Sequence, residues 1–155
     1  MIRKINNYWG TETERQILRT KGYTVVGIAN EIKELINDMA QTCMASDSCI
    51  GLAANQVWDD PIMPPPAIFL LKMSEGVIPF INPVLEKSFK KETEAFEQCM
   101  SIPGKKIKIR RPYHILTRFI DGEGTEHTQH FYGVMSRIWL HEFDHVTGKV
   151  ILDYE

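Results

Sequence analysis

The sequence predicts an α+β fold, with antiparallel or mixed β-sheets packed around a central, buried C-terminal helix and a further helix near the N-terminus. Apolar residues recur every three or four positions within residues 30–44 and again within residues 133–146, the spacing typical of helices. Between these helices, extended-looking runs follow one another directly along the chain. Strands in succession, rather than in alternation with helices, favour an α+β fold over a doubly wound α/β fold.

The first helix is expected over Asn30–Met44 and ends at a polar break, Ser46–Ser48. The small, apolar run CIGLAANQV follows. The next segment, WDDPIMPPP at Trp58–Pro66, cannot continue a helix or a strand, because its prolines lack N–H donors. We therefore expect a long connecting loop there.

Strands are expected from Ala67 onward, in the runs AIFLLK, FINPVLEKSFKK, ETEAFEQCM and KIKIRRPYHILTRFI. The tetrad DGEG, Asp121–Gly124, is typical of a hairpin turn. The second helix is expected over about Gly133–Val146, where Gly148 is placed to end it. A short strand over Val150–Asp153 is expected to close the chain.

Length and composition predict one ordinary globular domain over residues 1–155, since single domains typically span about 50–250 residues. The formal charge of −2 excludes the broad basic surface of nucleic-acid-binding proteins. No run approaches the roughly 20 apolar residues that span a bilayer. The odd cysteine count without a secretory leader favours a reducing compartment, with Cys43 and Cys49 as buried free thiols.

The motif HEFDH, His141–His145, carries the chemistry of the second helix. Residues four apart on a helix share one face, so His141 and His145 aim their imidazoles at one point, on the same stripe as Val134 and Ile138. Glu142 stands beside that point, where a base for a metal-activated water is needed. The motif therefore predicts a metal site, but it supplies only two ligands.

The third ligand is expected upstream of the helix, because only two acidic residues follow it, too near the end to fold back. The candidates are Cys99, His114, His127 and His130. Cys99 is favoured because it stands in EQCMSIPG, at the end of a strand-like run and ahead of a proline–glycine break, where a side chain can face a cleft. The three histidines are expected to be surface or structural residues.

Three motifs occur in order: CIGLAANQ at residues 49–56, EQCMS at residues 97–101 and LHEFDH at residues 140–145. Together they resemble the motifs of the peptide deformylase family, G-Φ-G-Φ-A-A-x-Q, E-G-C-Φ-S and Q-H-E-x-D-H, where Φ is apolar. That family removes the formyl group from the initiator methionine of new bacterial and organellar proteins. The sequence departs from the pattern at Cys49, Gln98 and Leu140, none of which is a metal ligand or the catalytic glutamate.

The resemblance implies one divalent metal held by Cys99, His141 and His145, with a water in the open fourth position. It implies Fe(II) as the native metal, whereas the ligand set alone would also accept zinc, nickel or cobalt. Glu142 is expected to take the water proton and hand it to the leaving amine. The side-chain amide of Gln56 and the backbone N–H of Met100 are expected to stabilise the oxyanion.

Expected substrate contacts gather around this site. They are Ile50, Gly51, Glu97, Gln98, Val134 and Ile138. The backbone at Ile50 and Gly51 is implied to pair with the peptide as an added strand. Val134 and Ile138 would wall an apolar slot for methionine, although an ordinary core role explains them equally well.

The implied partners are N-formylmethionyl nascent peptides, with no nucleic acid and no membrane. We expect a monomer, and weak ribosome association because the helical extension of the family after the last strand is absent. The expected location is the cytoplasm of a bacterial or phage-infected cell, or an organelle if a transit peptide was removed. Two rival interpretations stay open: a metallopeptidase of other specificity, and a deformylase-like fold with altered or weak activity that binds peptides as a metalloprotein.

Overall fold

The computed structural model describes all 155 residues. In chain order its elements are α1 (Glu12–Leu18), α2 (Asn30–Met44), β1 (Gly51–Ala53), the 3-10 turn η1 (Ala54–Gln56), β2 (Ile68–Met73), β3 (Gly76–Ser88), β4 (Glu92–Glu97), β5 (Ile107–Pro112), β6 (His114–Ile120), β7 (Glu126–Tyr132), α3 (Gly133–Val146) and the 3-10 turn η2 (Ile151–Tyr154). None of the three α-helices combines the length and apolar character needed to cross a membrane.

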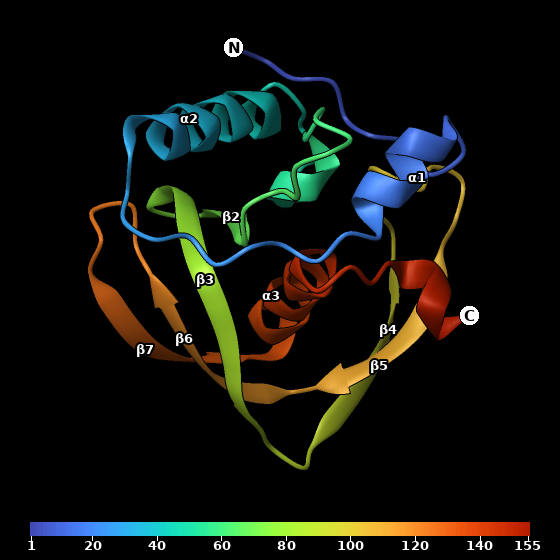
Figure 1. Cartoon of the computed structure of the whole chain (residues 1–155). Helices are drawn as coiled ribbons and strands as arrows, with labels where there is room; N and C mark the ends of the chain where they lie inside the picture. Colours follow the sequence, from blue (N-terminus) through green and yellow to red (C-terminus); the bar gives the residue numbers. More distant parts are fainter.

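The strands form two antiparallel sheets. Five of them pair in the order β1-β2-β3-β6-β7, and β4 and β5 pair as a separate two-stranded sheet. Helix α3 lies in the middle of the molecule, with β3, β6 and β7 to one side of it and β4 and β5 to the other (Figure 1). Helix α2 covers the end of the large sheet formed by β1 and β2. The predicted α+β fold with a central C-terminal helix is confirmed.

Helix α3 packs its apolar side chains against the large sheet. Trp139 is fully buried, and its ring lies edge-on to Phe69 and stacks on Phe143, with ring centroids 5.4 and 5.0 Å apart. Burying a ring of this size removes a large apolar area from water and therefore stabilises the fold strongly. This packing fixes the helix and so fixes where its histidines point.

The run KIKIRRPYHILTRFI is not one strand but two strands of different sheets. Strand β5 ends at Pro112 and β6 begins at His114. Proline has no N–H for a sheet ladder, and Tyr113 instead donates its N–H to Lys91 and accepts from the N–H of Gly133. The chain therefore turns at Pro112 from one sheet to the other.

Two short elements differ from expectation. Residues 12–18 form α1, whose start is a capping box in which Thr11 and Glu14 satisfy each other's backbone N–H groups. At the other end, the expected strand over Val150–Asp153 is wrong: residues 151–154 form a 3-10 turn, because the Asp153 carboxylate accepts the Val150 N–H in place of a ladder partner.

The expectation of free thiols at Cys43 and Cys49 is also wrong, because the two form a disulfide. Helix α2 ends at Met44, and the turn that follows brings position 49 back against the last turn of the helix, with Cα atoms 5.3 Å apart. Both cysteines are buried. Cys99 is the remaining free cysteine.

Candidate metal centre and cleft

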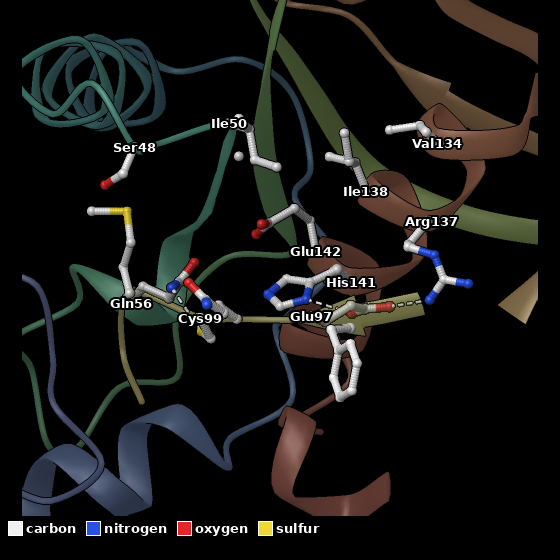
Figure 2. A pocket seen from close by; sticks show the side chains of 14 residues that line it. Ser48, Ile50, Gln56, Glu97, Cys99, Val134, Arg137, Ile138, His141 and Glu142 are labelled. Carbon is white, nitrogen blue, oxygen red and sulfur yellow. Dashed lines mark hydrogen bonds and ion pairs between the residues drawn. The ribbon is translucent and has the colours of Figure 1, made fainter. Parts of the chain in front are cut away.

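Three side chains meet at one point between α3 and the end of β4. The ligand atoms of Cys99, His141 and His145 all lie within 4.8 Å of one another, and the Cys99 sulfur is 3.3 Å from Nε2 of His145. Successive turns of α3 carry the two histidines, and Cys99 stands two residues beyond the end of β4. In Figure 2 the ring of His141 faces Cys99. The structure thus selects one of the four candidates for the third ligand.

The other candidates lie outside this group, on β6 and β7. His114 and His130 face each other with ring nitrogens 2.7 Å apart, and His127 pairs with Asp121 in the hairpin turn. His127 and His130 are exposed and His114 is partly exposed, as expected of surface residues.

The orientation of His141 is set by a buried carboxylate. Nδ1 of His141 lies 2.9 Å from Oε1 of Glu97, which leaves Nε2 to face Cys99. Both oxygens of Glu97 are taken up by His141 and by two arginines, Arg111 and Arg137. Although Glu97 lines the cleft, its carboxylate is directed to these three side chains and not to the open space where a substrate contact was expected.

The donor set fits a divalent transition metal. One thiolate and two imidazoles are ligands that such ions prefer. Burial alone would raise the pKa of Cys99, but the positive charge of His145 and hydrogen bonds with His141 and His145 outweigh it and lower that pKa to about 5. This direction favours the thiolate, the form that binds metal.

Glu142 lies on α3 beside this group and is almost fully buried. One of its carboxylate oxygens, Oε2, has no hydrogen-bond partner in the protein. Burial raises the pKa of Glu142, against the charges of His141 and His145 that lower it. Figure 2 shows the carboxylate turned into the cleft, toward the side of Ile50. An unpaired, buried carboxylate in this place can exchange a proton with a reacting molecule.

Gln56 approaches the site from η1. Its side-chain nitrogen lies 3.1 Å from Oγ of Ser101 and 3.7 Å from the sulfur of Cys99, while its oxygen accepts the N–H of Ala53. The oxygen is therefore fixed by the backbone and the N–H₂ group is aimed at the metal centre. The backbone N–H of Met100, beside Cys99, makes no hydrogen bond within the chain.

A cleft of about 400 Å³ opens above the metal centre, lined by residues of β1, β4 and α3. Ile50 and Val134 are 55% and 72% exposed and so form its rim, and Ile138 lies deeper between them. Gln98 is exposed on the strand side. All six expected substrate contacts thus line one cavity.

Arg111 and Arg137 also contact the site without having been expected there, as does Ser101, which ends the EQCMS motif but was given no role. A signal existed for Arg111, because in KIKIRRP the alternate residues Ile107 and Ile109 face the core and period-2 alternation places Arg111 on the same face. For Arg137 the corresponding signal was its place on the helix face that carries Val134, Ile138 and His141. A charge on a buried face implies a buried partner, which here is Glu97.

A family model for polypeptide deformylase matches residues 8–154. The peptide deformylase of Thermoanaerobacter pseudethanolicus is 31% identical over 138 residues, which are 89% of this chain and 82% of that protein. The crystal structure of peptide deformylase from Thermotoga maritima has a TM-score of 0.86 at 25% identity, covering 99% of this chain and 97% of that one. That of Synechococcus elongatus in complex with actinonin has a TM-score of 0.80 at 26% identity, covering 99% and 76%. With a match along almost its whole length, the chain belongs to the polypeptide deformylase family.

Proposed function

We propose that this chain is a peptide deformylase, which hydrolyses the N-formyl group from the initiator methionine of nascent polypeptides and releases formate. One observation carries the proposal: the unpaired carboxylate of Glu142 lies beside the point where Cys99, His141 and His145 converge, at the floor of an apolar cleft. Amide hydrolysis needs an activated water and a proton carrier at one place; a metal held by the three ligands would supply the first, and Glu142 would be the second.

One divalent ion held by Cys99, His141 and His145 is part of the proposal. When bound, it would acidify a water in the cleft and polarise the formyl carbonyl. Fe(II) is the expected native ion, and zinc, nickel and cobalt suit the same donors. Metal analysis of anaerobically purified protein identifies the ion.

The residues of the chain supply proton transfer and charge stabilisation. Glu142 takes a proton from the attacking water and later gives it to the leaving amine nitrogen. Burial raises the pKa of Glu142, which favours its return of the proton as an acid. The N–H₂ group of Gln56 and the free N–H of Met100 donate to the carbonyl oxygen as it gains charge.

The cleft positions the substrate. β1 is the edge strand of the large sheet, so a peptide can pair with its free side at Ile50 and Gly51. The methionine side chain would enter the apolar slot between Ile50, Val134 and Ile138. Gln98 is exposed and lines the same cleft. We reassign Glu97 from substrate contact to holding His141, because its oxygens are already occupied.

We further propose that residues 1–155 form one domain and that the protein is a monomer. Its proposed location is the cytoplasm of a bacterial or phage-infected cell, or an organelle, and its proposed association with the ribosome is weak. Cys99 of the strand region, Gln56 of η1 and the α3 residues must fold together to build the site, which supports a single unit. Light scattering and ribosome co-sedimentation test the monomer and the ribosome association.

A substrate comparison tests the activity. Protein loaded anaerobically with Fe(II) should release formate from formyl-Met-Ala and leave acetyl-Met-Ala and internal Met-Ala bonds intact. Equal turnover of the acetylated or internal peptide would support the metallopeptidase interpretation. Protein that is inert with Fe(II), Ni(II) or Co(II) bound would support a peptide-binding metalloprotein, the interpretation that the exposed Gln98 in the cleft favours.

A further inference from the structure

Two arginines contact the carboxylate that orients His141. Arg111 on β5 makes two hydrogen bonds with Glu97, from Nε to Oε2 at 2.6 Å and from Nη2 to Oε1 at 2.9 Å. Arg137 on α3 adds a third, from Nη1 to Oε2 at 2.7 Å. The dashed lines in Figure 2 join Glu97 to Arg137 and to His141. One carboxylate thus links a metal ligand to two cations.

Arg137 balances the charge of a buried group formed by Arg111, Glu97 and Asp144. The side chains of Arg111 and Glu97 are 4% and 6% exposed, and Arg111 also pairs with Asp144 through Nη1 at 2.9 Å. Arg111 is therefore shared between two carboxylates. Burying an uncompensated charge is costly, so the two anions need the second cation that Arg137 provides.

Arg137 also connects α3, the helix that carries His141 and His145, to the sheet of β4 and β5. Besides Glu97, its guanidinium donates to the backbone oxygens of Ile109 at 2.8 Å and Thr93 at 2.7 Å. A planar guanidinium with several fixed partners is held rigidly. Arg137 stands four residues before His141 on the same helix face, so the Glu97 carboxylate bridges adjacent turns, with Oε2 on Arg137 and Oε1 on His141.

This arrangement spans the two halves of the metal centre. Glu97 is the last residue of β4, and Cys99 follows it by two residues. Fixing Glu97 against α3 therefore fixes the distance between the segment that carries the sulfur and the helix that carries the imidazoles. Ligands brought together from separate elements bind metal well only if their supporting contacts hold them in place.

We propose that Arg137 is a positioning residue of the metal centre: it locks Glu97 so that His141 and Cys99 meet the same ion. The inference rests on the proposed metal site and adds a residue of this chain that the ligand motif does not contain. If Arg137 were only a structural tie between helix and sheet, its loss would lower stability and leave the metal ligands unchanged.

The test compares Arg137→Met, which keeps the apolar stem and removes the charge, with Arg137→Lys, which keeps the charge but not the planar fork. The control is Ser136→Ala. Ser136 is buried on the same helix and donates to Pro112 on β5 at 2.8 Å without touching Glu97. Measurements are the Co(II) absorption spectrum, the rate of Co(II) release to a chelator and the melting temperature of the metal-free protein.

We expect Arg137→Met to weaken Co(II) affinity about tenfold or more, the usual effect of losing a group that supports a ligand, with faster release and an altered spectrum. Arg137→Lys should fall between Arg137→Met and wild type, and it carries the comparison if Arg137→Met does not fold. Ser136→Ala should lower the melting temperature only. A wild-type spectrum and release rate in both Arg137 variants would overturn the inference and leave the metal site standing. If wild-type protein bound no Co(II) through its thiolate, both the inference about Arg137 and the proposed metal site would be overturned.

Discussion

The Cα of Gly51 lies directly against the side chain of Glu142. A Cβ atom at position 51 would stand 2.8 Å from Oε1 and 2.9 Å from Cγ of Glu142, closer than real Cβ contacts allow. The proposed substrate strand β1 and the proposed catalytic carboxylate of Glu142 therefore touch without room for a methyl group. Glycine at this position is required by the close approach and not by backbone conformation.

Gly51→Ala should consequently lower kcat by about 100-fold, because displacing a catalytic group by about 1 Å costs a factor of that order. Metal content should stay at the wild-type level, since no ligand moves. Formate release under saturating formyl-Met-Ala and metal analysis measure the two quantities. Gly122→Ala is the matched control, because its Cβ would meet only the Pro79 side chain at 3.3 Å in the distant hairpin turn. A Gly51→Ala protein with wild-type kcat would refute the contact as it stands.

Glu142→Gln should abolish turnover while leaving the metal site assembled. Losing a general acid–base group typically costs about 10²–10⁴ in rate. The amide keeps the volume of the side chain and removes a buried carboxylate that has an unpaired oxygen, so the melting temperature should not fall. Co(II) affinity, melting temperature and kcat are measured on the same preparation. Retention of more than a tenth of wild-type kcat would remove Glu142 from its proposed role.

Much of this site could be predicted because its information is local. The positions of His141, Glu142 and His145 follow from helical spacing alone, and the bounds expected for α2 and α3 match the structure. The contacts of Arg137 could not be predicted, because they depend on how β4, β5 and α3 pack together. Residues far apart in sequence have no periodicity that relates them.

Two further differences between the expected and the observed elements, at α1 and at the C-terminus, come from local side-chain capping. The capping pattern of Thr11 and Glu14 marks α1, but only seven residues follow it, too few for a clear apolar period. The strand expected at the C-terminus had apolar residues of the right type, but Asp153 caps its own turn, and these residues pack against β5 without joining either sheet. Side-chain capping decided the structure in both places.

The Cys43–Cys49 disulfide should be detectable by counting thiols. Metal-free protein purified in air and then denatured should show one reactive thiol, from Cys99, and three after reduction. Closing this short loop is expected to stabilise the fold by about 2 kcal/mol, mainly by restricting the unfolded chain. Reduction should therefore lower the melting temperature of the wild type and leave that of Cys49→Ala unchanged. Three reactive thiols before reduction would show that the pair stays open.

Glu14 should make the stability of the fold fall as the pH drops below about 5. Hydrogen bonds from Lys4 and from the backbone N–H groups of Thr11 and Asn7 outweigh burial and lower the pKa of Glu14 to about 2. A carboxyl whose pKa is lower in the folded than in the unfolded chain stabilises the fold above the unfolded value of about 4.3 and loses that contribution as the pH falls toward 2.

Glu14→Gln should therefore have a lower melting temperature than the wild type at pH 7, and the difference should shrink from about pH 4.5 downward and vanish near pH 2. Thermal unfolding of both proteins across this range measures it. Glu12→Gln is the control on the same helix. Glu12 is 69% exposed and pairs only with neighbouring side chains of its own helix, so its replacement should change the melting temperature much less. If the melting-temperature difference between Glu14→Gln and the wild type did not change with pH, the loss would come from the altered geometry of the cap. The negative charge of Glu14 would then contribute nothing to holding α1 in place.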